Sequence, residues 1–272
     1  MSKQCAAMSY AVVLLWSLCV TPVSAGSIDN LNSWTQVQDP PHTGMTGSVD
    51  SPIQVSLTAI GAVPAGTDIG YQSVNGSSPA GSSSGNYFSL SQDFHIAVDF
   101  NVSALDSVGF AAIGFGIGED ADGMNSAGPL LAFSNGAAVG FFGAARINDI
   151  TQPLALLPIP SSASGRFFVR YDSLLGDIIY GVNSTPGSAA PSHAGIFSGL
   201  QNSWNGDDLL VSLFLRSDIS PLTSGTVNAE FSNFEVLAGT PVSLVPLPAA
   251  GWLFGAALGG LLTFRSRCQT AG

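Results

Sequence analysis

The sequence predicts an all-β fold, an antiparallel β-sandwich, and two observations carry this prediction. Short runs of β-branched, aromatic and aliphatic residues recur along the chain, and Gly, Ser, Asn or Pro interrupts them. Between residues 26 and 240, no long stretch combines apolar residues at helical spacing with good helix formers. Many short strands joined by Gly- and Ser-containing turns are typical of sandwiches and jelly rolls.

Residues 1–25 are predicted to form a signal peptide with a short helical core. Lys3 gives the segment a positive start, residues 11–20 are apolar, and Val23-Ser24-Ala25 supplies the small residues of a cleavage site. We therefore expect the Sec translocon to export the chain and a peptidase to cut between Ala25 and Gly26. A buried N-terminal helix is the alternative.

Residues 26–240 form the predicted sandwich passenger. The run 94–100 alternates strictly, which directs Phe94, Ile96, Val98 and Phe100 towards a core. The run 167–172 alternates in the same way, and the loop 173–176 joins it to 178–182 as a hairpin. Two continuously apolar runs, 110–117 and 209–215, are predicted to be central strands. Further strands are expected at 34–37, 53–60, 130–133 and 138–142.

The last run of the passenger, 226–237, contains two phenylalanines that are three residues apart, one at an odd and one at an even position. A regular strand would place Phe231 and Phe234 on different faces, whereas a bulge at Ser232-Asn233 would turn both towards the core. This run resembles the closing strand of concanavalin-like and laminin-G-like jelly rolls at Gly225, Val227, Ala229, Phe231, Asn233, Phe234 and Val236. The resemblance implies that the first and last strands pair, which would bring Trp34 close to Phe234.

Residues 241–272 form a predicted C-terminal tail with an apolar helix at 249–264, followed by Arg265 and Arg267. The tail resembles the PEP-CTERM sorting tails in their VPLPA form. The matching residues are Val245, Pro246, Leu247, Pro248, Ala249, Trp252, Leu253, Phe254, Gly255, Gly260, Arg265 and Arg267.

The resemblance to sorting tails implies a partner and a location. An exosortase-type membrane enzyme of a Gram-negative bacterium would cut the tail near the Pro motif, and the passenger would be released or attached at the cell surface. Before processing, the tail would sit in the membrane with its arginines on the cytoplasmic side. Leu247 stands where the name-giving motif has Glu, which leaves the cognate enzyme open. A permanent single-span anchor is the alternative.

The charge balance excludes nucleic-acid binding. The chain has 272 residues, with 7 Lys and Arg against 18 Asp and Glu. The passenger keeps only four arginines (Arg146, Arg166, Arg170 and Arg216) and all 18 acidic residues, so its formal charge is near −14. So few basic residues cannot form a phosphate-binding patch. The three cysteines lie outside the passenger, which therefore depends on its core rather than on disulfides.

No motif for catalysis is present, and we predict that the protein is not an enzyme. The sequence lacks nucleophile elbows, zinc motifs and phosphate-binding loops. Glycoside hydrolases need two carboxylates about 5–9.5 Å apart. Glu230 and Glu235 would fall on opposite faces of a regular strand, and a bulge would change this.

One acidic loop, 118–125, is a candidate calcium site. Asp120, Asp122 and Asn125 follow one another around Gly123 and could supply several oxygen ligands, with Glu119 in support. A solvated acidic turn is the alternative.

Together these features predict an exported protein of the cell surface or biofilm matrix that binds polysaccharide without catalysis. Trp204 and Tyr87 are the candidate aromatic residues for stacking on sugar rings, unless they belong to the core. Two alternatives stay open: a secreted glycoside hydrolase or lyase of the same fold, and a structural matrix protein without a ligand.

Overall fold

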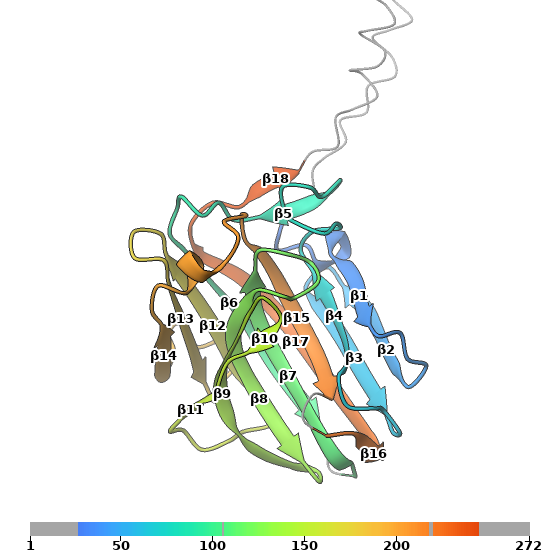
Figure 1. Ribbon diagram of the computed structural model, residues 1–272. Coiled ribbons are helices and arrows are strands. Elements are labelled where there is room, and N and C mark those ends of the chain that lie inside the picture. The colour runs from blue at the N-terminus through green and yellow to red at the C-terminus, as the bar shows by residue number, and fades with distance from the viewer. Residues whose placement is uncertain (1–26, 105, 218–219, 245–272) are drawn as a thin grey trace, which may run out of the picture. The chain divides into compact units, whose positions relative to one another are not determined.

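The computed structural model describes residues 27–104, 106–217 and 220–244 (Figure 1). These residues belong to the unit Gly26–Leu244. Within these ranges the strands are all antiparallel, and the helical residues form two short 3₁₀ turns, η1 (Leu31–Ser33) and η2 (Leu200–Ser203). The predicted all-β antiparallel sandwich is therefore confirmed. The signal segment and the tail from Val245 onward, with both predicted terminal helices, lie outside the described residues. In the described part, no helix is long and apolar enough to cross a membrane.

The larger sheet of the described chain has nine strands. Its main order is β1 (Thr35–Asp39), β4 (Thr67–Gln72), β15 (Leu210–Ser217), β7 (Val108–Gly118), β8 (Ser126–Ser134), β9 (Ala137–Ile147) and β10 (Ile150–Thr151). Two short strands extend it, because β11 (Ala155–Leu157) pairs with β9 and β16 (Leu222–Ser224) pairs with β7.

The second sheet of the described chain has seven strands. Its order is β14 (His193–Phe197), β13 (Asp177–Asn183), β12 (Ser164–Asp172), β6 (Phe94–Ser103), β17 (Thr226–Ala238), β3 (Gln54–Ile60) and β2 (Met45–Ser51). A small ribbon of β5 (Gly85–Tyr87) and β18 (Val242–Leu244) lies at one end of the sandwich (Figure 1).

The two continuously apolar runs form central strands, as predicted. β15 lies between β4 and β7, and β7 lies between β15 and β8. Along β15 the residues Val211, Leu213 and Leu215 are fully buried, because one face of the strand packs on the core. The alternate residues, Ser212, Phe214 and Arg216, are only partly buried and lie on the outer face.

The predicted alternation of β6 and the predicted hairpin are also confirmed. Phe94, Ile96, Val98 and Phe100 are each at most 1% exposed. Strands β12 and β13 pair in register with Asp172 opposite Asp177. Aromatic rings from β6 and β12 meet in the core, where the ring centroids of Phe100 and Phe167 are 4.3 Å apart. Stacked rings at this distance add to the stabilisation from buried area.

The bulge predicted in the last long strand is present in β17. Its pairing with β6 shifts between Ser232 and Glu235, and Asn233 has a φ of 51°. Because of this shift, Phe231 and Phe234 both face the core, with 0% and 6% exposure. Asn is among the few non-glycine residues that adopt a left-handed conformation readily.

Trp34 lies close to Phe234, as expected, but the expected cause, pairing of the first and last strands, was wrong. The ring centroids are 5.3 Å apart in an edge-to-face arrangement. However, β1 pairs with β4 in the nine-stranded sheet, whereas β17 lies between β6 and β3 in the other sheet. The first and last long strands therefore do not pair, and the two rings meet between the sheets.

Candidate functional site

A groove of about 420 Å³ lies on the outer face of the nine-stranded sheet. Outward-facing residues of β1, β4, β15, β7, β8 and β9 line it, together with the loop between β7 and β8. A volume of this size is within the range of pockets for small ligands, roughly 300–1,000 Å³.

Strand register places the polar side chains of the groove in rows. Gln72 is directly opposite Ser212, and Asp68 is directly opposite Arg216, on the paired strands β4 and β15. On the other side of β4, Asp39 of β1 is the partner of Asp68. Opposed residues in antiparallel strands have Cβ atoms about 4.5–5.5 Å apart, so each row forms one continuous polar surface.

Phe214 forms the main aromatic part of the groove. A Cβ atom at Gly114 would lie 2.0 Å from the Phe214 ring, so the ring occupies the space that glycine leaves open on the neighbouring strand. The Arg216 guanidinium carbon lies 5.0 Å from the centroid of the same ring. This cation–π geometry holds a planar cationic group beside the apolar ring.

Gln72 lines the groove with an unmet acceptor, and Arg146, whose buried Nε has no hydrogen-bond partner among the described residues, lines it with an unmet donor. The side chain of Gln72 lines the groove and the residue is only 9% exposed. The amide Nε2 donates to the carbonyl oxygen of Ala121 at 2.8 Å, which fixes the orientation of the amide. The Oε1 atom has no hydrogen-bond partner among the described residues. A buried acceptor without a donor costs about 1–3 kcal/mol, which a ligand hydroxyl or amine would recover.

The acidic loop contributes Asp120 and Asp122 to the groove. Asp120 accepts a hydrogen bond from the backbone amide of Met124 at 2.9 Å. Burial raises the pKa of Asp120 above its usual value, and the nearby charges of Glu119 and Asp122 raise it further. A carboxyl group with a raised pKa in a groove is often functional.

The other two polar residues of this loop have structural bonds. Glu119 is 1% exposed, and its carboxylate accepts backbone hydrogen bonds from Gly206 at 2.8 Å and from Asp207 at 3.3 Å. Asn125 is fully buried; it donates to Glu119 at 2.8 Å, and its Oδ1 accepts from the amide of Asn148 at 2.6 Å. The loop therefore holds the segment 205–207 in place.

The proposed calcium ligands are only partly brought together. Asn125 is buried and its oxygen already accepts a hydrogen bond, so only Asp120 and Asp122 of the three line the groove. Across residues 27–104, 106–217 and 220–244, no group of three or more His, Cys, Asp or Glu side chains could hold a metal ion. Calcium binding here stays a prediction.

The two aromatic residues predicted to stack on sugars lie elsewhere. Trp204 is only 7% exposed and belongs to the core, so the expectation of an exposed indole was wrong. It follows η2, and its burial closes that end of the core. Tyr87 is partly buried in β5, opposite Val242 of β18. Neither residue lines the groove.

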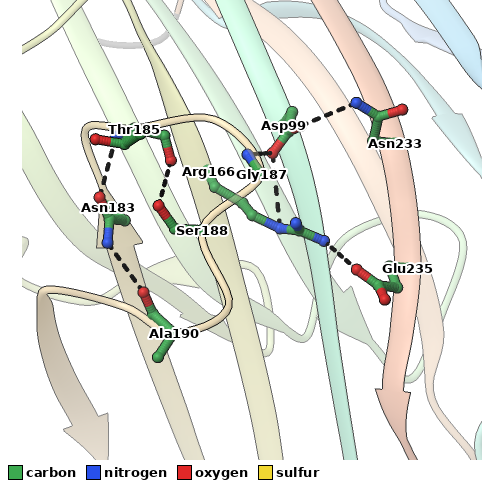
Figure 2. Close-up of polar contacts among 9 residues, drawn as sticks. All are labelled: Asp99, Arg166, Asn183, Thr185, Gly187, Ser188, Ala190, Asn233 and Glu235. Atoms are coloured by element: carbon green, nitrogen blue, oxygen red, sulfur yellow. Dashed lines mark hydrogen bonds and ion pairs between the residues drawn. The ribbon is translucent and has the colours of Figure 1, made fainter.

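A second polar cluster lies on the outer face of the other sheet (Figure 2). Arg166 Nη2 binds Glu235 at 2.6 Å, and its Nε lies 3.6 Å from Asp99. Asp99 also accepts from the amide of Gly187 at 2.9 Å and from Asn233 at 3.0 Å. Arg166 and Asp99 are 4% and 5% exposed because the loop between β13 and β14 covers them (Figure 2). The cluster therefore interacts within the fold, although Arg166 Nε makes no hydrogen bond among the described residues.

The bulge in β17 also changes the position of the two glutamates considered for catalysis. Glu230 is opposite Asn101 and Glu235 is opposite Ala97, so both lie on the outer face of the sheet. Four residues of strand separate their partners, a distance of about 13 Å. This exceeds the separation that glycoside hydrolases use.

The sequence did not single out Gln72, Asp68, Phe214 or Arg216 as site residues, although all four line the groove. The alternation of Ser212, Phe214 and Arg216 with buried residues of β15 was a usable signal for an outward face. Their neighbours on β1 and β4 could not be found in this way, because the pairing of β15 with β4 joins residues far apart in the chain.

No family model matches the chain, and no curated protein matches its sequence. Among solved structures it is similar to GH43B of the Bacteroides ovatus xyloglucan PUL, with 13% identity, 75% of this chain and 36% of that chain covered, and a TM-score of 0.44. It is also similar to an alginate lyase from Klebsiella pneumoniae, with 10% identity, 72% of this chain and 84% of that chain covered, and a TM-score of 0.46. A third similar structure is peanut lectin, with 14% identity, 79% of this chain and 96% of that chain covered, and a TM-score of 0.42. The chain spans about a third of the first structure. At these identities and scores, the similarities assign no activity to it.

Proposed function

We propose that this chain is an exported, non-enzymatic protein of the Gram-negative cell surface or biofilm matrix, and that it binds polysaccharide in the groove of its nine-stranded sheet. The observation that carries the proposal is Gln72, which lines the groove and whose buried Oε1 has no hydrogen-bond donor among the described residues. The outer face of a concanavalin-type sandwich would thus provide the binding surface.

The chemistry of the groove suits a sugar chain. Sugars present hydroxyl donors and apolar C–H surfaces together, and the groove combines polar Gln72 and Ser212 with the Phe214 ring. These features support binding and do not require catalysis.

The binding proposal is tested with an array of polysaccharides and the purified full chain. We expect Gln72→Leu to weaken binding of the best glycan by about two- to tenfold, because one hydrogen bond is worth about 0.5–1.5 kcal/mol. Gln54→Leu is the matched control, since Gln54 lies on β3 in the other sheet. Equal loss in both variants, or no glycan bound at all, would overturn the proposal.

The sorting proposal is independent of the groove. Replacing Pro246-Leu247-Pro248 by alanines should leave the unprocessed chain in the inner membrane of the producing bacterium. Membrane fractionation and blotting would show this, with the neighbouring Ser243→Ala variant as the control for normal maturation. A normally matured product from the triple variant would exclude exosortase-type processing at this motif.

A second candidate function is a glycoside hydrolase or lyase, and one observation favours it. Asp39 and Asp68 are directly opposed on β1 and β4 and both line the groove. Opposed positions bring Cβ atoms to about 4.5–5.5 Å, so the two carboxyl groups can approach the separation of about 5–5.5 Å that retaining glycosidases use. Release of new reducing ends from a bound glycan, abolished in Asp68→Asn, would support this alternative over simple binding.

A further inference from the structure

The groove carries information about the chemical class of its glycan, and this inference rests on the proposed function. The charged side chains of its lining are mainly acidic, with four aspartates against two arginines. Asp39, Asp68, Asp120 and Asp122 contribute four carboxyl groups, and Gln72 contributes an amide oxygen. Ionised carboxylates accept hydrogen bonds and donate none. A ligand for this surface must therefore supply donors.

The Gln72 oxygen indicates, independently of the acidic residues, that the groove needs a hydrogen-bond donor. The Ala121 carbonyl can only accept, so the amide atom facing it is the nitrogen, and the oxygen is the atom left without a donor. The residue is nine-tenths buried, and Oε1 has no partner among the described residues. Only a donor from the ligand or from solvent can satisfy it.

The positive groups of the groove do not cancel its acidic character. Arg146 forms an ion pair with Asp149 at 2.5 Å, so its charge is already balanced by an acid that does not line the groove. Arg216 lies opposite Asp68 and 5.0 Å from the Phe214 ring, so it can balance only one of the four carboxylates. Residues 26–244 contain no lysine. An open cleft lined by one sign of charge attracts ligands of the opposite sign.

We propose that the groove binds a polysaccharide that carries protonated amino groups, such as a partly de-N-acetylated amino-sugar chain. An ammonium group offers three donors and no acceptor, which matches both the carboxylates and the Gln72 oxygen. N-acetylation removes the charge and adds an acceptor. Polyuronates carry the same charge as the groove and are repelled.

The test compares two oligosaccharides of equal length, glucosamine and N-acetylglucosamine oligomers, by calorimetry with the purified full chain. The buffer contains a calcium chelator and is mildly acidic, so that the amines are charged. We expect at least tenfold tighter binding of the glucosamine oligomer, and a loss of this preference between about 50 and 300 mM salt because exposed charges are then screened. Oligoalginate should not bind.

The outcomes separate this inference from the proposed function. Equal affinity for both oligomers, or tighter binding of oligoalginate, would overturn the amino-sugar assignment while leaving polysaccharide binding in place. Failure of every glycan on the array would overturn both. Preferential and salt-sensitive binding of the free-amine oligomer supports the assignment.

Two matched variants test whether the preference arises in the groove. Asp122→Asn removes one exposed carboxylate from the lining, and Asp106→Asn makes the same charge change at an exposed position outside it. We expect a several-fold loss of affinity for the glucosamine oligomer only in Asp122→Asn. An equal loss in both variants would mean that overall charge, and not the groove, attracts the oligomer, and would overturn the assignment.

Discussion

Trp34 and Phe234 meet edge to face between the two sheets, with ring centroids 5.3 Å apart. The Trp34 indole Nε1 donates to the carbonyl oxygen of Ile28 at 2.8 Å, so the buried ring keeps a hydrogen bond. Phe115 of β7 contacts the same phenylalanine, with centroids 6.1 Å apart. This contact therefore fixes the start of the described chain to its last long strand.

The aromatic contact should be measurable as a coupling energy. We expect Phe234→Ala to lower the free energy of unfolding by about 3–5 kcal/mol. A double-mutant cycle of Trp34→Leu and Phe234→Leu should give a coupling of about 0.5–1.5 kcal/mol, measured by urea unfolding. The control cycle pairs Trp34 with Phe197 on β14, at the other edge of the sandwich, and should be additive. Equal coupling in both cycles would contradict a direct contact.

The bulge at Asn233 predicts an unusual order of two substitutions. Asn233 has a φ of 51° and donates to Asp99. Gly loses the hydrogen bond but accepts this backbone conformation, whereas Ala loses the bond and is strained. Asn233→Ala should therefore be less stable than Asn233→Gly by about 1 kcal/mol in thermal or urea unfolding. The order expected in a regular strand, with Ala more stable than Gly, would exclude the bulge.

Arg166 should be far more important for stability than its neighbour Arg170. Arg166 is buried with Asp99, and removing it leaves a buried carboxylate without its cation. We expect Arg166→Leu to cost about 3–5 kcal/mol in urea unfolding. Arg170→Leu, at an exposed position of the same strand, should change stability by less than about 0.5 kcal/mol.

Adding Asp99→Asn to Arg166→Leu tests the cause of this effect. If the cost comes from the stranded charge, the second substitution should recover part of it. If the two side chains act independently, the costs of the two substitutions add. The double variant would then be less stable than Arg166→Leu by the amount that Asp99→Asn costs in the unsubstituted protein, which would contradict the stranded-charge explanation.

The pKa of Asp120 predicts how stability depends on pH. Burial raises the pKa of this carboxyl group in the folded state, so the fold binds its proton more tightly than the unfolded chain does. The stabilisation that this group contributes by binding its proton more tightly in the fold is fully present below about pH 3.8. It is lost as the pH rises through the raised pKa of the folded state. Asp120→Asn should raise the melting temperature at pH 7 in chelator, and the difference should vanish at about pH 3. A lower melting temperature at pH 7 would contradict this.

Calcium binding by the acidic loop is tested separately. If Asp120 and Asp122 bind the ion, adding calcium to the chelated protein should raise its melting temperature, because ligands that bind only the folded state stabilise it. The increase should be absent in Asp122→Asn and unchanged in Asp106→Asn. Equal melting temperatures with and without calcium would reject the site.

The sequence alone determined the local features of the sandwich. Alternation identified the core face of β6, apolar continuity identified the central strands β7 and β15, and parity identified the bulge of β17. These succeed because side-chain direction in a strand follows from the two-residue period of the backbone. The hairpin of β12 and β13 was likewise determined, since its two strands are adjacent in the chain.

Only the tertiary structure decided which strands pair and what lies on their outer faces. Gln72 meets Ser212, and Asp39 meets Asp68, through pairings that no local pattern encodes. The same limit explains Trp204, whose Gly- and Asn-containing surroundings indicated a surface loop although the core encloses the ring. Side-chain direction is a property of one strand, whereas a groove is a property of several strands brought together by folding. The sequence therefore determined the sandwich, and the packing of distant strands decided its candidate site.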